Sequence, residues 1–333
     1  MEVNNKCIAV TGGAGFIGSH LVDQLVTRRN KVIVIDDFST GKWDNIDRHR
    51  MNSHVLIQQA DVRDLDTMIR LLEDVDVVFH LAVACLRVSL NDPKAVHEIN
   101  ATGTLTMCQA ALKNNVSRFI YVSSSEAYGS AIYVPMDEGH PLNPTTVYGA
   151  SKAAGELYAL AYWQTYGLPV IVVRPFNNYG PREPSEGKRA EVIPKFVMRA
   201  MAGSPPVIFG TGTQTRDFTW VEDTARGIIL AAECNALIGD RVNLARGQEV
   251  SIGQICRLVL EKLDRQDLEP IILQDGRPGD VQRHFADIGK AQRLMDFAPT
   301  IDIDQGIDRY IRWVKAQNPN LKSWMQQEAV QNW

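Results

Sequence analysis

A tyrosine and a lysine lie four residues apart in the stretch YGASK, so Tyr148 and Lys152 would share one face of a helix. A lysine beside a tyrosine stabilises the phenolate and lowers the pKa of the phenol from about 10 toward neutrality. Such a tyrosine can accept a proton from a substrate hydroxyl while a hydride leaves the same carbon for a nicotinamide ring. The apolar run RFIYV leads into SSSE, which places the hydroxyl of Ser124 where it can hold or pass that proton. Together these residues predict a hydride-transfer site.

A glycine-rich segment, TGGAGFIG, follows the first predicted strand and opens the first predicted helix. Gly12 would permit a tight turn, Gly15 a close approach of the backbone to a pyrophosphate, and Gly18 close packing of helix and strand. The helix N-terminus then offers unpaired N–H groups and the positive end of its dipole to the anion. Such turns also occur without a ligand, but here the flanking elements are those of a dinucleotide site. The predicted cofactor contacts of this loop are Gly12, Gly15, Phe16, Ile17 and Gly18.

Two acidic residues end the second strand-like run, KVIVIDD. Asp36, with Asp37 beside it, can accept hydrogen bonds from the adenine ribose and repel a 2′-phosphate, which favours NAD over NADP. Lys42 lies a few residues further on and would favour the opposite choice. We therefore expect NAD as the cofactor.

Two further strand ends fit the same cofactor. Asp61 and Val62 follow HVLIQQA, where the carboxylate can meet the adenine amino group or instead cap the following helix. In the stretch HLA, Leu81 and Ala82 leave space for a flat ligand, whereas His80 is interpreted as a packed core residue. All four ligand-facing residues are predicted cofactor contacts.

These motifs lie between short aliphatic runs that alternate with longer amphipathic stretches. The runs CIAV, KVIVID, HVLIQQAD, DVVFHLA, RFIYVSS and PVIVVRP lack period-two alternation, which is typical of strands buried on both faces of a parallel sheet. Their alternation with helix-like segments predicts an α/β fold, a Rossmann-type doubly wound parallel sheet with a smaller C-terminal α/β substrate domain. We expect residues 1–174 to form the NAD-binding domain and residues 175–333 mainly the substrate domain, with residues from about 217 to 245 returning to the first.

The overall composition excludes several classes of protein. A formal charge of -4 gives no sign of a nucleic-acid binder, which normally carries a basic patch. No apolar run approaches the roughly 18 residues that span a bilayer, and no signal peptide precedes the first strand, so no membrane association and a cytoplasmic location are expected. The cysteines are odd in number and lack CxxC spacing, which favours buried thiols in a reducing compartment and no metal site; they are Cys7, Cys85, Cys108, Cys234 and Cys256.

Motifs along nearly the whole chain resemble those of one family. TGGAGFIGSHL, HLA, SSSEAYG, YGASK, RPFNNYGPR, VIFG, TRDFTWVED and RPGD are similar to the extended short-chain dehydrogenase/reductases, and more narrowly to the nucleotide-sugar epimerases and dehydratases. The resemblance implies a Rossmann domain with a smaller C-terminal domain, a retained NAD, and oxidation of a UDP-sugar at C4 followed by return of the hydride. It implies that Ser124, Tyr148 and Lys152 form the catalytic triad and that Asn177 contacts the diphosphate.

The resemblance also implies contacts to the rest of the nucleotide sugar. The segments VIPKF, which begins at Val192, and VIFG, which contains Phe209, resemble those that line the nucleobase. Arg216 in TRDF and Arg277 in RPGD match arginines that hold the diphosphate, a role suited to a planar, forked donor. The alternatives are a core position for Phe209 and surface ion pairs for the two arginines.

The residues beside Ser124 bear on which reaction follows the C4 ketone. The family's 4,6-dehydratases read Thr-Asp-Glu here, whereas this chain has Ser125, a poor general acid, and Glu126. We therefore expect 4-epimerisation, with dehydration or decarboxylation using Glu126 as base as the alternative, and a non-catalytic NAD-binding sensor as a more remote one. Ser125 is expected to contact the substrate at C6. Arg87 and Arg182 are candidates for a sugar carboxylate, which would distinguish a hexuronic acid from a neutral hexose.

Two helical regions are further candidates for association between copies of the chain. The resemblance implies a homodimer formed through helices near residues 100–114 and 150–166. The first of these, ATGTLTMCQAALKNN, contains enough apolar residues for such packing. The expected partners are thus a nucleotide sugar and a second copy of the chain.

Overall fold

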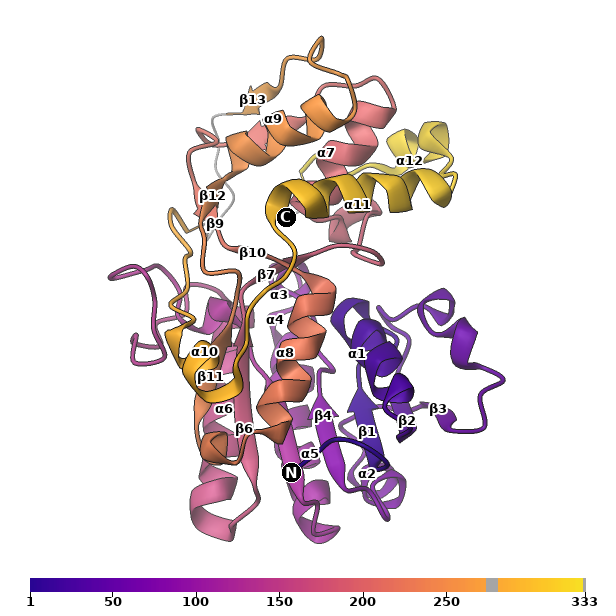
Figure 1. Ribbon diagram of the computed structural model, residues 1–333, viewed down its shortest axis with the longest axis vertical. Coiled ribbons are helices and arrows are strands. Elements are labelled where there is room, and N and C mark those ends of the chain that lie inside the picture. The colour runs from indigo at the N-terminus through magenta and orange to yellow at the C-terminus, as the bar shows by residue number, and fades with distance from the viewer. Residues whose placement is uncertain (274–280, 332–333) are drawn as a thin grey trace.

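A seven-stranded, all-parallel sheet organises the larger part of the molecule (Figure 1). The computed structural model describes residues 1–273 and 281–331. The strands lie in the order β11-β6-β5-β4-β1-β2-β3. Their bounds are β1 Cys7–Thr11, β2 Lys31–Asp36, β3 Val55–Gln59, β4 Val77–His80, β5 Arg118–Val122, β6 Val170–Pro175 and β11 Arg241–Leu244. Because the strand order reverses between β1 and β4, a crevice is left beyond their carboxyl ends, where ligands of such sheets bind.

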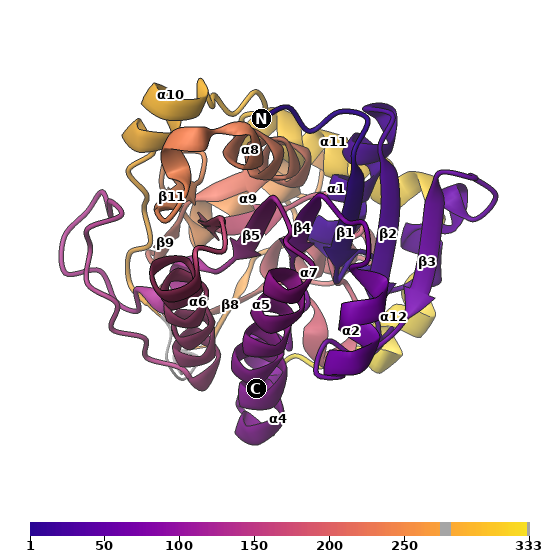
Figure 2. The ribbon, with the colours of Figure 1, turned by 90° about the horizontal axis from the view of Figure 1, so that it is seen from below.

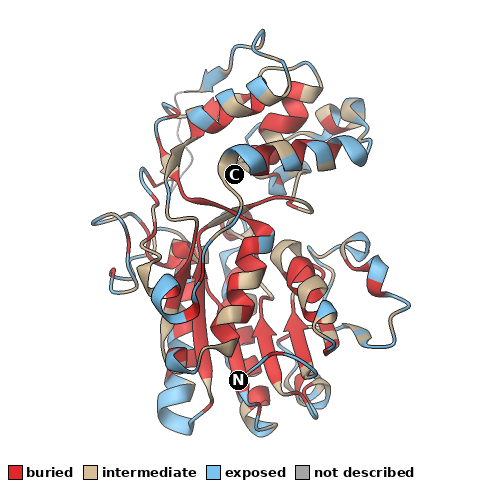
Figure 3. Cartoon of the chain, in the orientation of Figure 1, coloured by how far each residue is buried: buried red, intermediate tan, exposed pale blue. Residues whose placement is uncertain are grey.

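Helices cover both faces of this sheet, as the view from below shows (Figure 2). On one face α1 (Phe16–Thr27) and α8 (Val221–Glu233) pack together against the strands. On the other lie α2 (Leu65–Leu71), α5 (Gly103–Lys113) and α6 (Val147–Tyr166). The strands are accordingly buried along most of their length, except the edge strand β3, which has no fully buried residue (Figure 3). This arrangement confirms the predicted doubly wound fold.

Several short elements connect the strands to the helices. After β4 the chain forms α3 (Leu86–Ser89), α4 (Pro93–His97) and a π-helical turn over Glu98–Thr102 that continues into α5. After β5 a 3-10 turn spans Ser125–Ala127. The remaining 3-10 turns are Trp43–Asn45, Asp47–His49, Gly187–Arg189 and Asn235–Leu237.

The chain crosses more than once between the sheet and a smaller C-terminal part. After β6 it enters the smaller part, and it returns through α8 and β11, which pairs in parallel with β6. The return of residues near 217–245 to the sheet was expected from their sequence, and it makes β11 the edge strand beside β6.

The smaller part has its own apolar core, above the sheet in Figure 1. Aromatic and aliphatic side chains of its helices meet there, and Trp324 of α12 is among the buried ones. The last residues before the chain end thus form a docked helix. The bounds are β7 Asn177–Tyr179, α7 Val192–Met201, β8 Val207–Phe209, β9 Thr215–Arg216, β10 Phe218–Trp220, β12 Val250–Ser251, α9 Ile252–Lys262, β13 Ile271–Leu273, α11 Ile303–Ala316 and α12 Leu321–Gln327. Between β13 and α11 the chain returns once more to the sheet, where α10 (Gly289–Met295) packs beside β11 (Figure 1).

A buried ion pair connects α6 to β6 behind the crevice. The guanidinium of Arg174 donates to both carboxylate oxygens of Glu156, with Nε 2.9 Å from Oε2. Its Nη1 also donates to the hydroxyl of Tyr128 at 2.7 Å. The side chains of Arg174 and Glu156 are each only 1% exposed, so each charge depends on the other for its solvation.

Two further expectations concern the burial of the cysteines and the absence of membrane-spanning segments. The five cysteines are free thiols, but only Cys108 and Cys256 are buried, which corrects the expectation that all five would be. Among the described residues, no helix is both long and apolar enough to span a membrane.

Candidate active site

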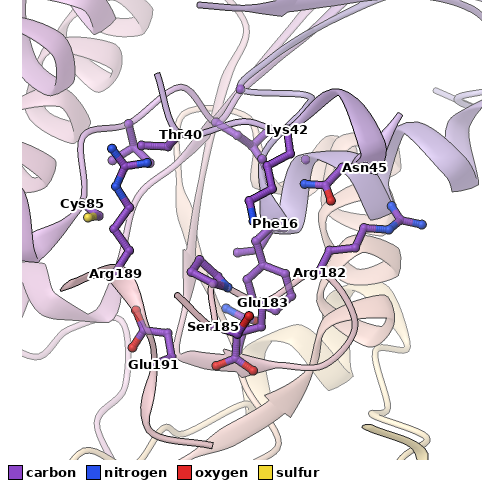
Figure 4. Close-up of a pocket in the computed structure, with 18 of the residues that line it drawn as sticks. Phe16, Thr40, Lys42, Asn45, Cys85, Arg182, Glu183, Ser185, Arg189 and Glu191 are labelled. Carbon is purple, nitrogen blue, oxygen red and sulfur yellow. The ribbon is translucent and has the colours of Figure 1, made fainter. Parts of the chain in front are cut away.

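A cavity of about 1300 Å³ opens at the carboxyl ends of the sheet strands and extends to the C-terminal helices α11 and α12 (Figure 4). Most of the residues that the sequence singled out line it. These are Gly12, Gly15, Phe16, Ile17, Gly18, Asp36, Asp37, Asp61, Val62, Leu81, Ala82, Arg87, Ser124, Ser125, Glu126, Tyr148, Lys152, Asn177 and Arg182. The fold therefore brings the predicted cofactor loop and the predicted catalytic residues into one cavity.

The glycines of the first loop are required by backbone contacts. Gly12 has a φ of +67°, and a Cβ there would lie 2.8 Å from the backbone nitrogen of Ala82. A Cβ on Gly18 would lie 2.1 Å from the carbonyl oxygen of Gly12. Gly15 occupies the N-cap of α1, where it brings no side chain between the first helical N–H groups and the cavity. The loop thus has the close packing and exposed N–H groups of a pyrophosphate site.

Asp36 lies at the end of β2 with its carboxylate inside the cavity. Its Oδ2 accepts from the backbone N–H of Ala14 and its Oδ1 from that of Phe38, both at 2.9 Å. Burial nevertheless raises the pKa of this carboxyl above its ordinary value. Lys42, which the sequence left as an argument for NADP, forms an ion pair of 3.2 Å with Glu186. The positive charge of Lys42, near Asp36, is therefore partly neutralised by Glu186.

Asp61 does not cap the following helix. Its carboxylate pairs with Arg63, with Nη2 2.5 Å from Oδ2, and this contact lowers the pKa of Asp61. The N-cap of α2 is Asp64, which accepts from the backbone N–H of Thr67 at 3.1 Å. The capping alternative for Asp61 is thus wrong, and the residue remains at the cavity wall.

His80 holds the turn that follows β4, a role that sequence reasoning did not identify. The hydroxyl of Thr11 accepts from the backbone N–H of Leu81 and of Ala82 at 3.1 and 3.2 Å. It therefore donates its own hydrogen to Nδ1 of His80 at 2.7 Å, which leaves Nε2 to donate to Thr104 at 3.1 Å. A neutral imidazole satisfies this network, and burial lowers the pKa of His80 to about 3.

This network predicts that the protein becomes less stable in acid. The pKa of His80 is about 3 in the folded chain against 6.5 for the free imidazole, so below pH 6.5 the unfolded chain binds a proton that the folded chain does not. The stability associated with neutral His80 is complete above that pH and is lost progressively as the pH falls toward 3. We expect the melting temperature of His80→Asn to fall less between pH 7.5 and 5 than that of the wild type. His54→Asn, a substitution of an exposed histidine, serves as control. If the melting temperature of His80→Asn depends on pH as steeply as that of the wild type, the assignment of a neutral, buried His80 is contradicted.

The predicted triad meets at the start of α6. Thr146 caps this helix by accepting from the backbone N–H of Gly149, which places Tyr148 in the first turn. The phenol of Tyr148 is hydrogen-bonded to the side chain of Ser124. One turn later the ammonium of Lys152 donates to the carbonyl oxygen of Val122 at 2.7 Å and lies 4.5 Å from the ring centroid of Tyr121. The end of β5 and the start of α6 thus fix all three groups.

The pKa values in this site differ from the sequence expectation. Burial raises the pKa of Tyr148, while its hydrogen bond with Ser124 lowers it and the nearby carboxylate of Glu126 raises it further. Burial also lowers the pKa of Lys152 to about 7, against which the charge of Glu156 acts. The expected lowering of the phenol pKa is therefore wrong, because desolvation outweighs the hydrogen bond with Ser124.

Two buried polar atoms at the cavity wall are candidates for hydrogen bonds with a ligand. The hydroxyl of Ser123 and Oδ1 of Asn177 have no hydrogen-bond partner among the described residues. Both residues line the cavity, one at the end of β5 and the other at the start of β7. Buried polar groups are normally paired, so these atoms fit a polar cofactor or substrate. Asn177 was predicted from its motif, whereas Ser123 was not singled out.

The two arginines considered for a sugar carboxylate already pair with carboxylates of the protein. Arg87 binds Glu191 with both terminal nitrogens, at 2.5 and 2.9 Å. Arg182 lies 2.6 Å from Asp23 of α1. Both guanidiniums are thus ion-paired, although Nε of Arg87 and Nη1 of Arg182 are buried without a hydrogen-bond partner among the described residues.

Other predicted substrate contacts lie elsewhere. Val192, Phe209 and Arg216 are not among the described residues that line the cavity. Arg216 donates to the carbonyl oxygens of Thr215 and Val281, both at 2.7 Å. Arg277 lies outside the described residues, so its role remains a prediction, as do those of the other three.

The loop of residues 181–191 bridges the two parts of the molecule along the cavity. Arg189 donates to the carbonyl oxygen of Ser39 at 3.0 Å, and the indole of Trp324 donates to that of Ser185 at 2.5 Å. Together with the pairs Lys42–Glu186 and Arg182–Asp23, these contacts hold the loop to both sides. It is therefore a wall of the cavity and not a surface excursion.

No group of three or more histidine, cysteine or acidic side chains arranged for a metal ion was found in the described part of the chain.

Comparison with known proteins agrees with this site. The model of the NAD dependent epimerase/dehydratase family matches residues 8–245. A putative UDP-glucose 4-epimerase of Methanocaldococcus jannaschii is 36% identical over 93% of this chain and 99% of that protein.

Two solved structures of 4-epimerases are also similar to this chain. A UDP-N-acetylglucosamine 4-epimerase from Methanobrevibacter ruminantium, in complex with UDP-N-acetylmuramic acid, has a TM-score of 0.88 and 34% identity over 94% of this chain and 99% of its own. A UDP-glucuronic acid 4-epimerase from Bacillus cereus, in complex with UDP-glucuronic acid and NAD, has a TM-score of 0.87 and 30% identity over 93% and 99%.

The doubly wound sheet, the glycine loop and the tyrosine–lysine pair define an NAD-dependent enzyme of the extended short-chain dehydrogenase/reductase type. The chain belongs to the NAD dependent epimerase/dehydratase family, as its motifs predicted.

Proposed function

We propose that the protein is a nucleotide-sugar 4-epimerase that acts through a transient 4-keto sugar, on a UDP-hexose or a UDP-hexuronic acid. The observation that carries this proposal is the hydrogen bond between Ser124 and Tyr148, with Lys152 one turn away, in the cavity that also contains the glycine loop. Relatives named as 4-epimerases, similar over more than nine-tenths of this chain, support the same reaction.

In this mechanism Tyr148 takes the proton of the C4 hydroxyl, with Ser124 holding the same hydroxyl in place. Bound NAD supplies the hydride acceptor and donor at C4, and its positively charged ring opposes the raised phenol pKa. Lys152, held by the carbonyl oxygen of Val122, keeps a positive charge beside the phenolate as the proton moves. The proton returns from Tyr148 when the ketone is reduced, so the reaction leaves no net oxidation.

Inversion at C4 requires the 4-keto sugar to present its other face. The cavity of about 1300 Å³ offers room for the sugar to swing about its phosphate linkage. The unpaired Oδ1 of Asn177 is an acceptor and fits a hydroxyl of the ligand, whereas the expected contact with the diphosphate would use the Nδ2 donors of the same amide.

The position of Glu126 keeps elimination or decarboxylation as a second candidate. Its carboxylate lines the cavity close enough to Tyr148 to raise the pKa of the phenol, so it could remove a proton at C5. The group beside it is the buried hydroxyl of Ser125, which is too weak an acid to protonate a departing C6 hydroxyl. Because Glu126 stands beside a serine and not beside an acidic residue, epimerisation is favoured over 4,6-dehydration.

The experiment that tests the function is incubation of the holoenzyme with a panel of UDP-sugars and analysis of the products by NMR. Equilibration of the C4 epimers supports the proposal. A new deoxy group or loss of carbon dioxide would replace it by the second candidate. Binding of NAD and nucleotide sugar with no turnover of any sugar would favour a sensor.

We also propose a homodimer formed through α5 and α6. Large apolar side chains remain exposed along these neighbouring helices, namely Leu105 at 37%, Leu157 at 59%, Tyr158 at 40% and Trp163 at 36%. Such a face is typical of an interface between subunits. The molecular mass in solution, measured by light scattering, is expected to be twice that of the chain; a monomer at micromolar concentration would contradict it.

A further inference from the structure

The cavity near Tyr148 is rich in carboxylates. Glu126, Glu183 and Glu191 all line it, and both Glu126 and Glu191 act on Tyr148 in the direction that raises the pKa of the phenol. Figure 4 shows Glu183 and Glu191 on the same side of the pocket, opposite Thr40 and Lys42. The reacting end of the cavity is thus bordered by acidic groups from the turn after β5 and from the loop of residues 181–191.

Arg87 forms an ion pair with one of these carboxylates, although its Nε is buried without a hydrogen-bond partner among the described residues. Arg87, in the short helix α3, has a side chain that is 9% exposed. Its two terminal nitrogens bind the two oxygens of Glu191 in the parallel, bidentate geometry that guanidinium and carboxylate favour. Since this pair is internally neutral, Arg87 adds no net attraction for a further anion.

Glu183 adds a second acidic group to the same wall. Its carboxyl is buried, accepts from the backbone N–H of Gly180 at 3.3 Å, and interacts electrostatically with both Glu191 and Arg87. Burial and the proximity of Glu191 raise the pKa of Glu183. Neutral or charged, this group can exchange hydrogen bonds with sugar hydroxyls, but it offers no compensation to a second carboxylate.

The two arginines of the loop form contacts elsewhere, whereas the exposed Lys188 also lines the cavity. Arg182 pairs with Asp23 of α1, and Arg189 donates to the backbone of Ser39 beyond β2. A carboxylate on the sugar would therefore meet Glu183 and Glu191 without an unpaired guanidinium from these residues.

We propose that Glu191 makes the sugar site selective for nucleotide sugars without a carboxylate, because it occupies the guanidinium of Arg87, while the neighbouring Glu183 offers a sugar carboxylate no compensating charge. This inference rests on the proposed function, and it narrows the substrate from hexose or hexuronic acid to a neutral hexose. A carboxylate that loses its water without gaining an available counter-charge binds poorly, so such a site discriminates between otherwise similar ligands.

The test compares UDP-glucose with UDP-glucuronate. Their dissociation constants are measured by calorimetry on the NAD-loaded Tyr148→Phe protein, where no turnover interferes, and their kcat/KM values on the wild type. We expect UDP-glucose to bind at least about tenfold more tightly, and Glu191→Gln to narrow that ratio on the order of tenfold by releasing the guanidinium of Arg87.

Glu186→Gln is the matched control. It removes the same charge from the same loop, but Glu186 is exposed and pairs with Lys42, so the ratio of the two affinities should not change. Glu191→Ala provides a second variant in case Glu191→Gln folds poorly, and it too should narrow the ratio because it also releases Arg87. A ratio of affinities is insensitive to a general loss of active protein, which a purely structural effect would cause.

Equal or tighter binding of UDP-glucuronate by the Tyr148→Phe protein would overturn the inference. So would an equal change of the ratio in Glu191→Gln and Glu186→Gln. If neither sugar is epimerised by the wild type, the proposed function fails, yet the binding ratio still decides whether the site excludes a carboxylate.

Discussion

Replacing Tyr148 by phenylalanine is expected to lower kcat by about 10²–10⁴-fold, the usual contribution of a positioned acid–base group. The phenol is the group that is hydrogen-bonded to Ser124 at the start of α6, whereas the ring itself remains in the variant. Bound NAD and the affinity for the nucleotide sugar should therefore be retained. The measurements are kcat by a coupled assay and the NAD content of the purified protein by absorbance after denaturation.

Tyr166→Phe is the matched control, since Tyr166 lies at the far end of the same helix and is 59% exposed. It should leave kcat within about twofold, as surface substitutions usually do. Comparable activity of Tyr148→Phe and the wild type would remove Tyr148 from the mechanism. Loss of NAD from Tyr148→Phe would instead assign the phenol a mainly structural role.

Replacing Arg174 by methionine is expected to cost about 3–5 kcal/mol of unfolding free energy, the typical loss when one partner of a buried ion pair is removed. The carboxylate of Glu156 would remain buried with its bidentate partner gone. The hydroxyl of Tyr128 would lose its contact with Nη1 as well. Urea unfolding followed by circular dichroism measures the change.

An exposed ion pair gives the comparison. Arg312 and Asp308 of α11 lie 2.8 Å apart, with side chains that are 68% and 47% exposed. Arg312→Met should change the unfolding free energy by about 0–1 kcal/mol, because water solvates the remaining carboxylate. Similar losses of unfolding free energy in Arg174→Met and Arg312→Met would contradict the conclusion that burial makes the Arg174–Glu156 pair more important for stability.

The fold and the centre of the site could be predicted from local sequence signals. Apolar runs without alternation indicated the buried parallel strands, and the glycine spacing indicated the loop where a Cβ on Gly18 would meet the backbone of Gly12. Tyr148 and Lys152 are four residues apart on one helix, so their proximity needed only the helix period. Each of these inferences depends on residues that are close in the chain.

The features that sequence reasoning missed depend on residues far apart in the chain. Arg87 and Glu191 are separated by 104 positions, and nothing in either stretch indicates that one neutralises the other. His80 and Thr11 likewise meet only because β4 and β1 pair in register. The raised pKa of Tyr148 follows from how completely the finished fold excludes water from it, which no motif encodes.

The pairing of β11 with β6 has a consequence for how the chain acquires its structure during synthesis. Until residues 241–244 have left the ribosome, one edge of the sheet has no neighbour, and the apolar side of α1 awaits the packing of α8. The nascent first half is therefore expected to persist as an incomplete, association-prone intermediate. We expect NAD to bind only after the smaller part has been synthesised and β11 has paired with β6.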